Sequence, residues 1–84
     1  MESDVAGKVI RAVADAAGVA PERITLETAL ADLGIDSLAA IRIISDLEEA
    51  FGIVVPDEDV VRIRTVGQAI ASLERVVGGK GNHA

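Results

Sequence analysis

The stretch SLAAIRIISDLEEAFG, residues 37–52, decides the fold, because its apolar residues recur at the three- and four-residue spacing of an amphipathic helix. Asp36 stands immediately before it as an N-cap, and Gly52 can end it in a left-handed conformation. We therefore expect a helix from Ser37 to Phe51. Its core-facing stripe consists of Ala40, Ile43, Ile44, Leu47 and Phe51.

The segments on either side repeat this helical pattern. The first helix begins after a possible N-cap at Ser3 and stops at Gly18, and Pro56 begins a brief helix with acids in its first turn. Thr65 and Gln68 form a capping-box pair that opens the last helix. The first stripe is Val5, Val9, Ile10, Val13 and Ala17, and the last is Val66, Ala69, Ile70, Leu73 and Val77. No segment alternates strictly, so we predict no strands.

A long connection, residues 19–35, separates the first two long helices, and Gly34 permits a turn near its end. The fold class predicted is therefore all-α: a small four-helix bundle with three longer helices, one short helix and a long first loop. The domain spans residues 1–77, and the Gly-rich residues 78–84 form a flexible tail. Apolar anchors expected to pack under the first loop are Pro21, Ile24, Leu26, Leu30 and Leu33.

The length and composition exclude several classes of function. An 84-residue chain forms one domain and is too short to enclose a deep cleft. The absence of cysteine excludes disulfides, cysteine–zinc sites and thiol chemistry from the polypeptide itself. No grouping has metal-ligand spacing, and no signal or membrane segment is recognisable. We expect a cytoplasmic monomer without a metal.

The net charge of −6 is unevenly distributed. Residues 27–59 contain nine acids and one base, Arg42, and therefore carry −8, whereas the rest of the chain carries +2. Such a segment repels phosphate backbones, so nucleic acid is a poor partner and a basic protein surface is a better one. A merely solvated acidic face remains the alternative.

Ser37 is expected at the first turn of the second helix, where unpaired N–H groups can hold a phosphate. A catalytic serine needs a base within reach, and the chain's single histidine, His83, stands in the tail. We therefore predict that the chain is not an enzyme and that any chemistry at Ser37 is catalysed by another protein. Alternatively, Ser37 has only a structural role as a second N-cap of the helix.

The motifs LGIDSL (33–38) and LEEAFGIVVPDED (47–59), with TVGQAI (65–70), resemble those of acyl carrier proteins of fatty-acid and polyketide synthesis. The resemblance implies that a phosphopantetheinyl transferase attaches 4′-phosphopantetheine from coenzyme A to Ser37, with Asp36 and Leu38 as motif neighbours. The arm's thiol then carries acyl groups as thioesters. An acyl-loading enzyme and a ketosynthase or other biosynthetic enzyme are the further partners implied. The aliphatic core could admit part of an acyl chain near Ile44, Ile63 and Val66.

The sequence departs from many fatty-acid carriers just after the serine. Those carriers have acidic residues there, whereas residues 39–42 of this chain contain no acid and include the cation Arg42. Like charges across an interface disfavour wrong partners, so we infer a specialised polyketide or related pathway. The alternative is an intrahelical pair of Arg42 with Asp46. Leu38 and Ile41 should form a docking patch beside the serine. The acids expected to steer partners are Asp46, Glu48, Glu49, Asp57, Glu58 and Asp59.

Two other functions remain open. The less acidic helix start favours an aminoacyl or peptidyl carrier, or a D-alanyl carrier, although Leu33-Gly34-Ile35 lacks the Gly-Gly pair usual in peptidyl carriers. A helical adaptor whose Ser37 is never modified is the alternative outside the carrier class.

Overall fold

The computed structural model describes residues 4–81, with side chains for residues 4–78. Within that range the chain is all-α, and its only strand-like feature is an isolated antiparallel bridge between Ala29 and Thr65. The predicted bundle of three long helices and one short helix is confirmed. The elements in chain order are α1 (Asp4–Ala17), η1 (Pro21–Arg23), η2 (Ala31–Leu33), α2 (Ser37–Phe51), α3 (Asp57–Val60) and α4 (Val66–Gly81), η1 and η2 being 3₁₀ helices.

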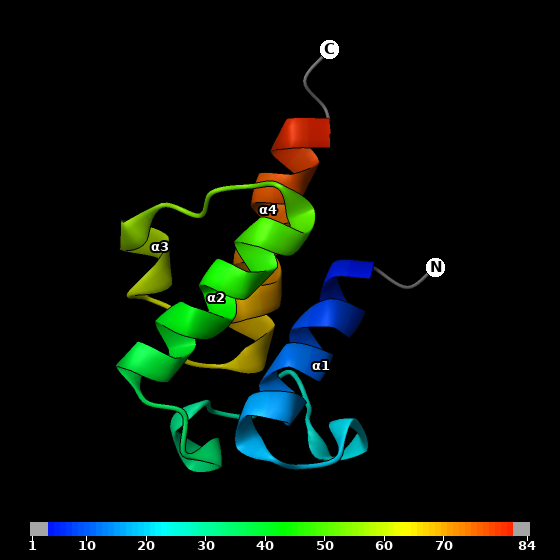
Figure 1. Cartoon of the computed structure of the whole chain (residues 1–84), viewed down its shortest axis with the longest axis vertical. Helices are drawn as coiled ribbons and strands as arrows, with labels where there is room; N and C mark the ends of the chain where they lie inside the picture. Colours follow the sequence, from blue (N-terminus) through cyan, green and yellow to red (C-terminus); the bar gives the residue numbers. More distant parts are fainter. Residues whose placement is uncertain (1–3, 82–84) are drawn as a thin grey trace.

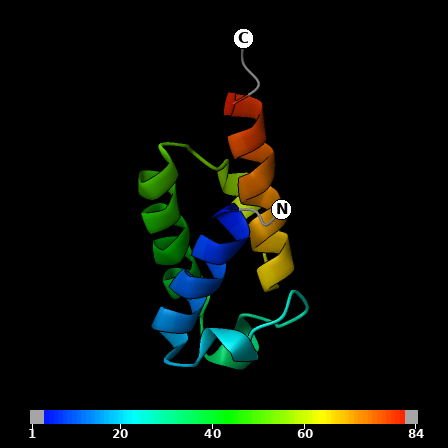
Figure 2. The ribbon, with the colours of Figure 1, turned by 90° about the vertical axis from the view of Figure 1, so that its right-hand side faces the viewer.

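The three long helices pack side by side, and α1 runs in the opposite direction to α2 and α4 (Figure 1). The starts of α2 and α4 therefore lie at the same end of the molecule. The connection from α1 to α2 crosses this end, and its middle part reaches the first turn of α4 (Figure 2). The site described below is built at this end.

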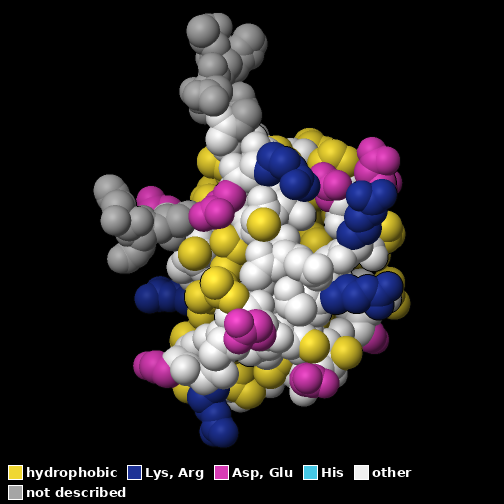
Figure 3. Space-filling view, turned by 180° about the vertical axis from the view of Figure 1, so that it is seen from behind, with side chains coloured by type: hydrophobic (Ala, Val, Ile, Leu, Met, Phe, Trp, Pro, Cys, Tyr) yellow, Lys and Arg dark blue, Asp and Glu magenta, His cyan; other side chains and the backbone are white. Residues whose placement is uncertain are grey.

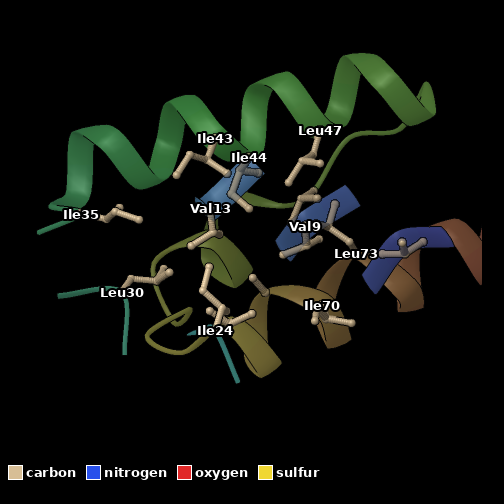
Figure 4. Packing of buried hydrophobic residues seen from close by; sticks show 14 of the residues in the cluster. Val9, Val13, Ile24, Leu30, Ile35, Ile43, Ile44, Leu47, Ile70 and Leu73 are labelled. Atoms are coloured by element: carbon tan, nitrogen blue, oxygen red, sulfur yellow. The ribbon is translucent and has the colours of Figure 1, made fainter. Parts of the chain in front are cut away.

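The core is aliphatic and comes from all three long helices and from the connections (Figure 4). The expected stripes are largely confirmed, since Val9, Ile44 and Leu73 are buried, while Ala40 and Phe51 lie half-buried at its edge. Burial of these side chains holds the helices together, because helices of this length are marginal in water on their own. The fully buried side chains of largest volume are Leu73, Val9, Val13 and Val66.

Helix boundaries follow the capping residues. Gly18 and Gly52 adopt left-handed φ values of 71° and 66° and end α1 and α2 as expected. At the start of α4, the Gln68 backbone N–H donates to Thr65 Oγ1 (3.2 Å), and the Thr65 N–H donates back to Gln68 Oε1 (3.1 Å). The predicted capping box is thus formed. Ser3, the expected cap of α1, lies outside the described residues.

The expectations for the first connection are only partly right. Ile24 and Leu30 are buried anchors, and Ile35, which was not predicted, joins them. Leu26 is 58% exposed, so its assignment as an apolar anchor is wrong. Pro21 is also exposed, because it begins the surface helix η1. Leu26 is held by its backbone instead, since the Gly67 N–H donates to its carbonyl oxygen (2.8 Å).

This backbone contact requires glycine at position 67. A Cβ atom there would lie 2.9 Å from the Leu26 carbonyl oxygen and 3.2 Å from the Leu26 Cβ. Two neighbouring bonds reinforce the contact: the Val66 N–H donates to the Thr28 carbonyl (3.0 Å), and the Leu30 N–H donates to the Arg64 carbonyl (2.9 Å). The first connection is therefore tied to the start of α4.

The last helix is longer than the sequence predicted. It continues through Gly81, beyond the domain boundary expected at residue 77, and only residues 82–84 of the expected tail, including His83, lie outside the described range. Three glycines weaken this stretch without stopping the helix. No helix within residues 4–81 is both long and apolar enough to cross a membrane.

Candidate functional site

Ser37 is the first residue of α2, and it is exposed. The Asp36 side chain caps the helix, as predicted: the Ala39 N–H donates to Asp36 Oδ1 at 2.9 Å. Before the cap, Gly34 takes φ 79° and Ile35 is buried. The backbone leading to the serine is therefore anchored, and the serine itself is exposed.

Among the described residues, the hydroxyl lacks an activating base. Within residues 4–78 it makes no hydrogen bond to a basic side chain, and the capping carboxylate of Asp36 is engaged with the helix backbone. A nucleophilic mechanism needs a base in hydrogen-bond contact with the serine. The described geometry is that of an acceptor hydroxyl on which a partner enzyme could act.

A shallow hollow opens beside Ser37 between the start of α2, the first connection and the segment between α3 and α4. Its walls are mainly small or aliphatic, with polar side chains only from Asp36, Ser37 and Arg64 among the described residues. An attached chain could lie against its mostly aliphatic wall. The lining residues are Ala29, Leu30, Ala31, Ile35, Asp36, Ser37, Ala40, Ile63 and Arg64.

Apolar side chains beside the serine are exposed. Leu38 is 72% and Ile41 is 48% exposed, as the sequence predicted. Ile41 also lines a groove between α2 and α3, whose opposite wall includes Val61, itself 72% exposed. Sequence reasoning missed Val61, because only the acids in the segment after Pro56 were considered. Together Leu38, Ile41 and Val61 form an exposed surface that we call the apolar patch.

The charged residues around the apolar patch differ in whether their side chains form hydrogen bonds or ion pairs. Arg42 and Asp46 are both exposed, but they form no ion pair within residues 4–78, so the intrahelical pair is not present. Glu48 accepts a hydrogen bond from the Val55 N–H (2.7 Å) and thereby helps fix the chain after α2. Asp59 pairs with Arg75 (3.2 Å).

Glu49, Asp57 and Glu58 are exposed and project their charge to solvent from the end of α2 and from α3. Seen from behind, Lys and Arg side chains lie on the α3 side of the molecule, with Asp and Glu side chains among them (Figure 3). Arg62 and Arg75 line a groove there together with Asp59 and Gln68.

The core contains a small cavity behind α2. Its volume is about 10 Å³, and its walls come from α1, α2, α3 and the start of α4, with Ile44, Leu47, Val60, Ile63 and Ala69 among the lining residues. Such a space is at the lower limit for a single water molecule. Any larger apolar guest requires these side chains to move apart.

These features define a class of protein: a small helical bundle that has an exposed serine at the start of a helix and no catalytic partner for it among the described side chains. The comparisons with known proteins agree with this class. Residues 7–73 match the family model described as "Phosphopantetheine attachment site". The chain is 39% identical to the acyl carrier protein of Amoebophilus asiaticus over 79 residues, which are 93% of this chain and 99% of that protein.

A second relative is much larger. Over 65 residues, 77% of this chain, the sequence is 42% identical to the 3-methylorcinaldehyde synthase tropA of Talaromyces stipitatus, of which the matched part is 2%. The chain belongs to the acyl carrier protein family, whose members carry 4′-phosphopantetheine. The site fits this group, because an exposed hydroxyl stands beside an open, mostly apolar hollow with one cation, Arg64, at its edge.

Proposed function

We propose that Ser37 carries the 4′-phosphopantetheine arm and that the chain delivers acyl groups, held as thioesters, to the enzymes of a specialised polyketide or related pathway. The observation that carries this proposal is the exposed serine at the capped start of α2. The chain has no cysteine, so the thiol that carries the acyl group comes with the arm. Asp36 holds the helix start in place, and Leu38 lies next to the hydroxyl for recognition by the transferase.

Attachment transfers the phosphopantetheine group of coenzyme A to Ser37. The Ser37 Oγ forms a new ester bond to phosphorus, and the bond to the adenine nucleotide's phosphate breaks. The nucleotide leaves, and the transferase accepts the serine proton. The chain itself contributes the positioned hydroxyl and an accessible helix start, which agrees with the lack of a base among the described residues around Ser37.

The partners we propose are the phosphopantetheinyl transferase, an acyl-loading enzyme and a ketosynthase. The apolar patch offers the direct contact, and Asp46, Glu49, Asp57 and Glu58 supply long-range attraction for a basic enzyme surface. Arg42 is exposed and lacks an ion pair within residues 4–78, so it repels a basic surface of that kind. This charge supports a partner different from a fatty-acid ketosynthase. The synthase from Talaromyces stipitatus also supports a polyketide pathway.

Intact-mass measurement tests the attachment. Coexpression with a promiscuous phosphopantetheinyl transferase should add one phosphopantetheine to the protein, and Ser37→Ala should abolish the addition. Ser45→Ala is the matched control, because Ser45 is an exposed serine on the same helix. A protein that stays unmodified would contradict the proposal and favour the unmodified adaptor.

Incubation of the phosphopantetheinylated protein with candidate loading enzymes tests the pathway. An acyltransferase should load it with an acyl group, whereas an adenylation domain should not. Loading by an adenylation domain would instead identify an aminoacyl, peptidyl or D-alanyl carrier.

We further propose that the core shelters only part of an acyl chain. The cavity bordered by Ile44 and Ile63 is small, so each added methylene must separate aliphatic side chains that are now in contact. Nuclear Overhauser contacts from the acyl group to Ile44, Ile63 or Val66 should appear in the acylated protein. Their complete absence would show that the chain stays outside the core.

A further inference from the structure

Arg64 is the only cationic side chain lining the hollow beside Ser37, among the described residues. It comes from the segment between α3 and α4, far from Ser37 in the sequence. The charge pattern of residues 27–59 does not include it. Only the tertiary structure brings Arg64 to this hollow.

The backbone of Arg64 is fixed on both sides. Its N–H donates to Gln68 Oε1 (2.8 Å), and its carbonyl accepts from the Leu30 N–H (2.9 Å). The Ala29–Thr65 bridge and the close contact of Gly67 with Leu26 hold the same two segments together. The backbone of Arg64 is therefore anchored at the hollow.

The guanidinium of Arg64 has no ion-pair partner within residues 4–78, unlike that of Arg75, which pairs with Asp59. A phosphodiester on Ser37 would add a negative charge directly beside the Asp36 carboxylate. Two like charges in contact repel each other, and a cation at the same hollow offsets this repulsion. Arginine is suited to this role, because its planar fork donates two parallel hydrogen bonds to phosphate oxygens.

We propose that Arg64 binds the phosphodiester of the attached arm and so sets the direction in which the arm leaves the protein. The proposal rests on Ser37 being the attachment site. Arg64 is a positioning residue here, since it acts on the arm and takes no part in acyl chemistry.

Arg62 provides a matched control two residues away. It is exposed and carries the same charge, but it lines the other groove, with Gln68 and Arg75, and does not line the hollow at Ser37. Arg62→Gln and Arg64→Gln therefore change the net charge equally and differ only in their place relative to the serine. Both replaced side chains are exposed, so both variants should fold.

The test is phosphorus-31 NMR of the phosphopantetheinylated protein. In Arg64→Gln the phosphodiester resonance should move toward its position in the same protein unfolded in urea, where no arginine is held nearby. In Arg62→Gln it should stay at the wild-type position. An equal shift in both variants would show that the resonance responds only to the net charge of the protein, and this result would overturn the proposal. The absence of a shift in Arg64→Gln would also overturn it.

A second measurement uses the wild-type chain and does not depend on either variant. The Arg64 Nε–H resonance should shift when the apo protein is converted to the phosphopantetheinylated form, and the Arg62 resonance should not. An Arg64 resonance unchanged by loading would overturn the proposal. Intact mass separates the two hypotheses: an unmodified protein contradicts attachment at Ser37, whereas a modified protein without these shifts contradicts only the role of Arg64.

Discussion

The starts of α2 and α4 lie at the same end of the molecule and are both capped by side chains, but they have different roles. Asp36 caps α2, and the Thr65–Gln68 pair caps α4. Behind its cap, α2 presents the exposed Ser37 and Leu38, whereas α4 begins with Val66, which is 0% exposed. The same local chemistry thus leaves an exposed surface at the start of α2 and a buried contact at the start of α4, and tertiary packing makes the difference.

The largest expected effect tests this difference in burial. Val66→Ala should lower the free energy of unfolding by about 2–3 kcal/mol, because it removes two buried methyl groups and leaves a cavity. Leu38→Ala, at the second position of α2, should change it by less than about 0.5 kcal/mol. Chemical denaturation measures both. Equal losses would show that the start of α2 is also part of the structural core.

A smaller loss is expected from the close backbone contact at the start of α4. Gly67→Ala places a Cβ against the Leu26 carbonyl, so we expect a net loss of about 1–2 kcal/mol after the better helix propensity of alanine is included. Gly78→Ala, in open space on the same helix, should instead stabilise by about 0.5–1 kcal/mol. Thermal unfolding distinguishes the two. A stabilised Gly67→Ala variant would refute the close contact.

The two caps should be nearly equivalent in energy. Asp36→Ala and Thr65→Ala should each cost about 1 kcal/mol of unfolding free energy, and Asp36→Ser should restore most of the loss at α2 because serine can also cap. Urea titration is the measurement. A failure of serine to restore stability would mean that Asp36 contributes by something other than capping.

The smallest effect on stability is expected at Arg42. This residue lies on the exposed surface of α2, so its replacement should change the interaction with partner enzymes instead. Arg42→Glu should change the free energy of unfolding by less than about 0.5 kcal/mol, since the side chain is exposed and forms no ion pair within residues 4–78. It should raise turnover with a fatty-acid ketosynthase, because it removes a charge that repels a basic surface. Arg11→Glu, an exposed site on α1, is the control. Unchanged or lower turnover with Arg42→Glu would contradict our inference about the partner.

Much of the fold could be predicted because it depends on residues close together in the sequence. The spacing of Ile43, Ile44 and Leu47 and the caps at both ends predicted the bounds of α2 correctly. Capping and periodicity act within one or two turns, so they are legible without the rest of the chain. The exposure of Leu38 and Ile41 followed from the same periodicity.

One error occurs where distant segments meet, and two further differences from expectation are local. Leu26 was predicted as an apolar anchor, but its carbonyl receives the Gly67 N–H while its side chain stays exposed. The Arg42–Asp46 pair has suitable spacing and is still not formed within the described residues, since the gain of an exposed pair is small. Residues 78–81 were predicted to belong to a flexible tail because they are rich in glycine, whereas α4 continues through Gly81.

The sequence by itself determined the helices, their caps, the lack of a thiol and the motif around Ser37, because each is a property of composition or of neighbours within a few residues. Only the tertiary structure decided that Arg64 shares a hollow with Ser37, that Val61 faces Ile41 and that the first connection is tied to α4. Those arrangements depend on burying aliphatic surface from three helices at once, and that packing brings together residues that no local pattern relates.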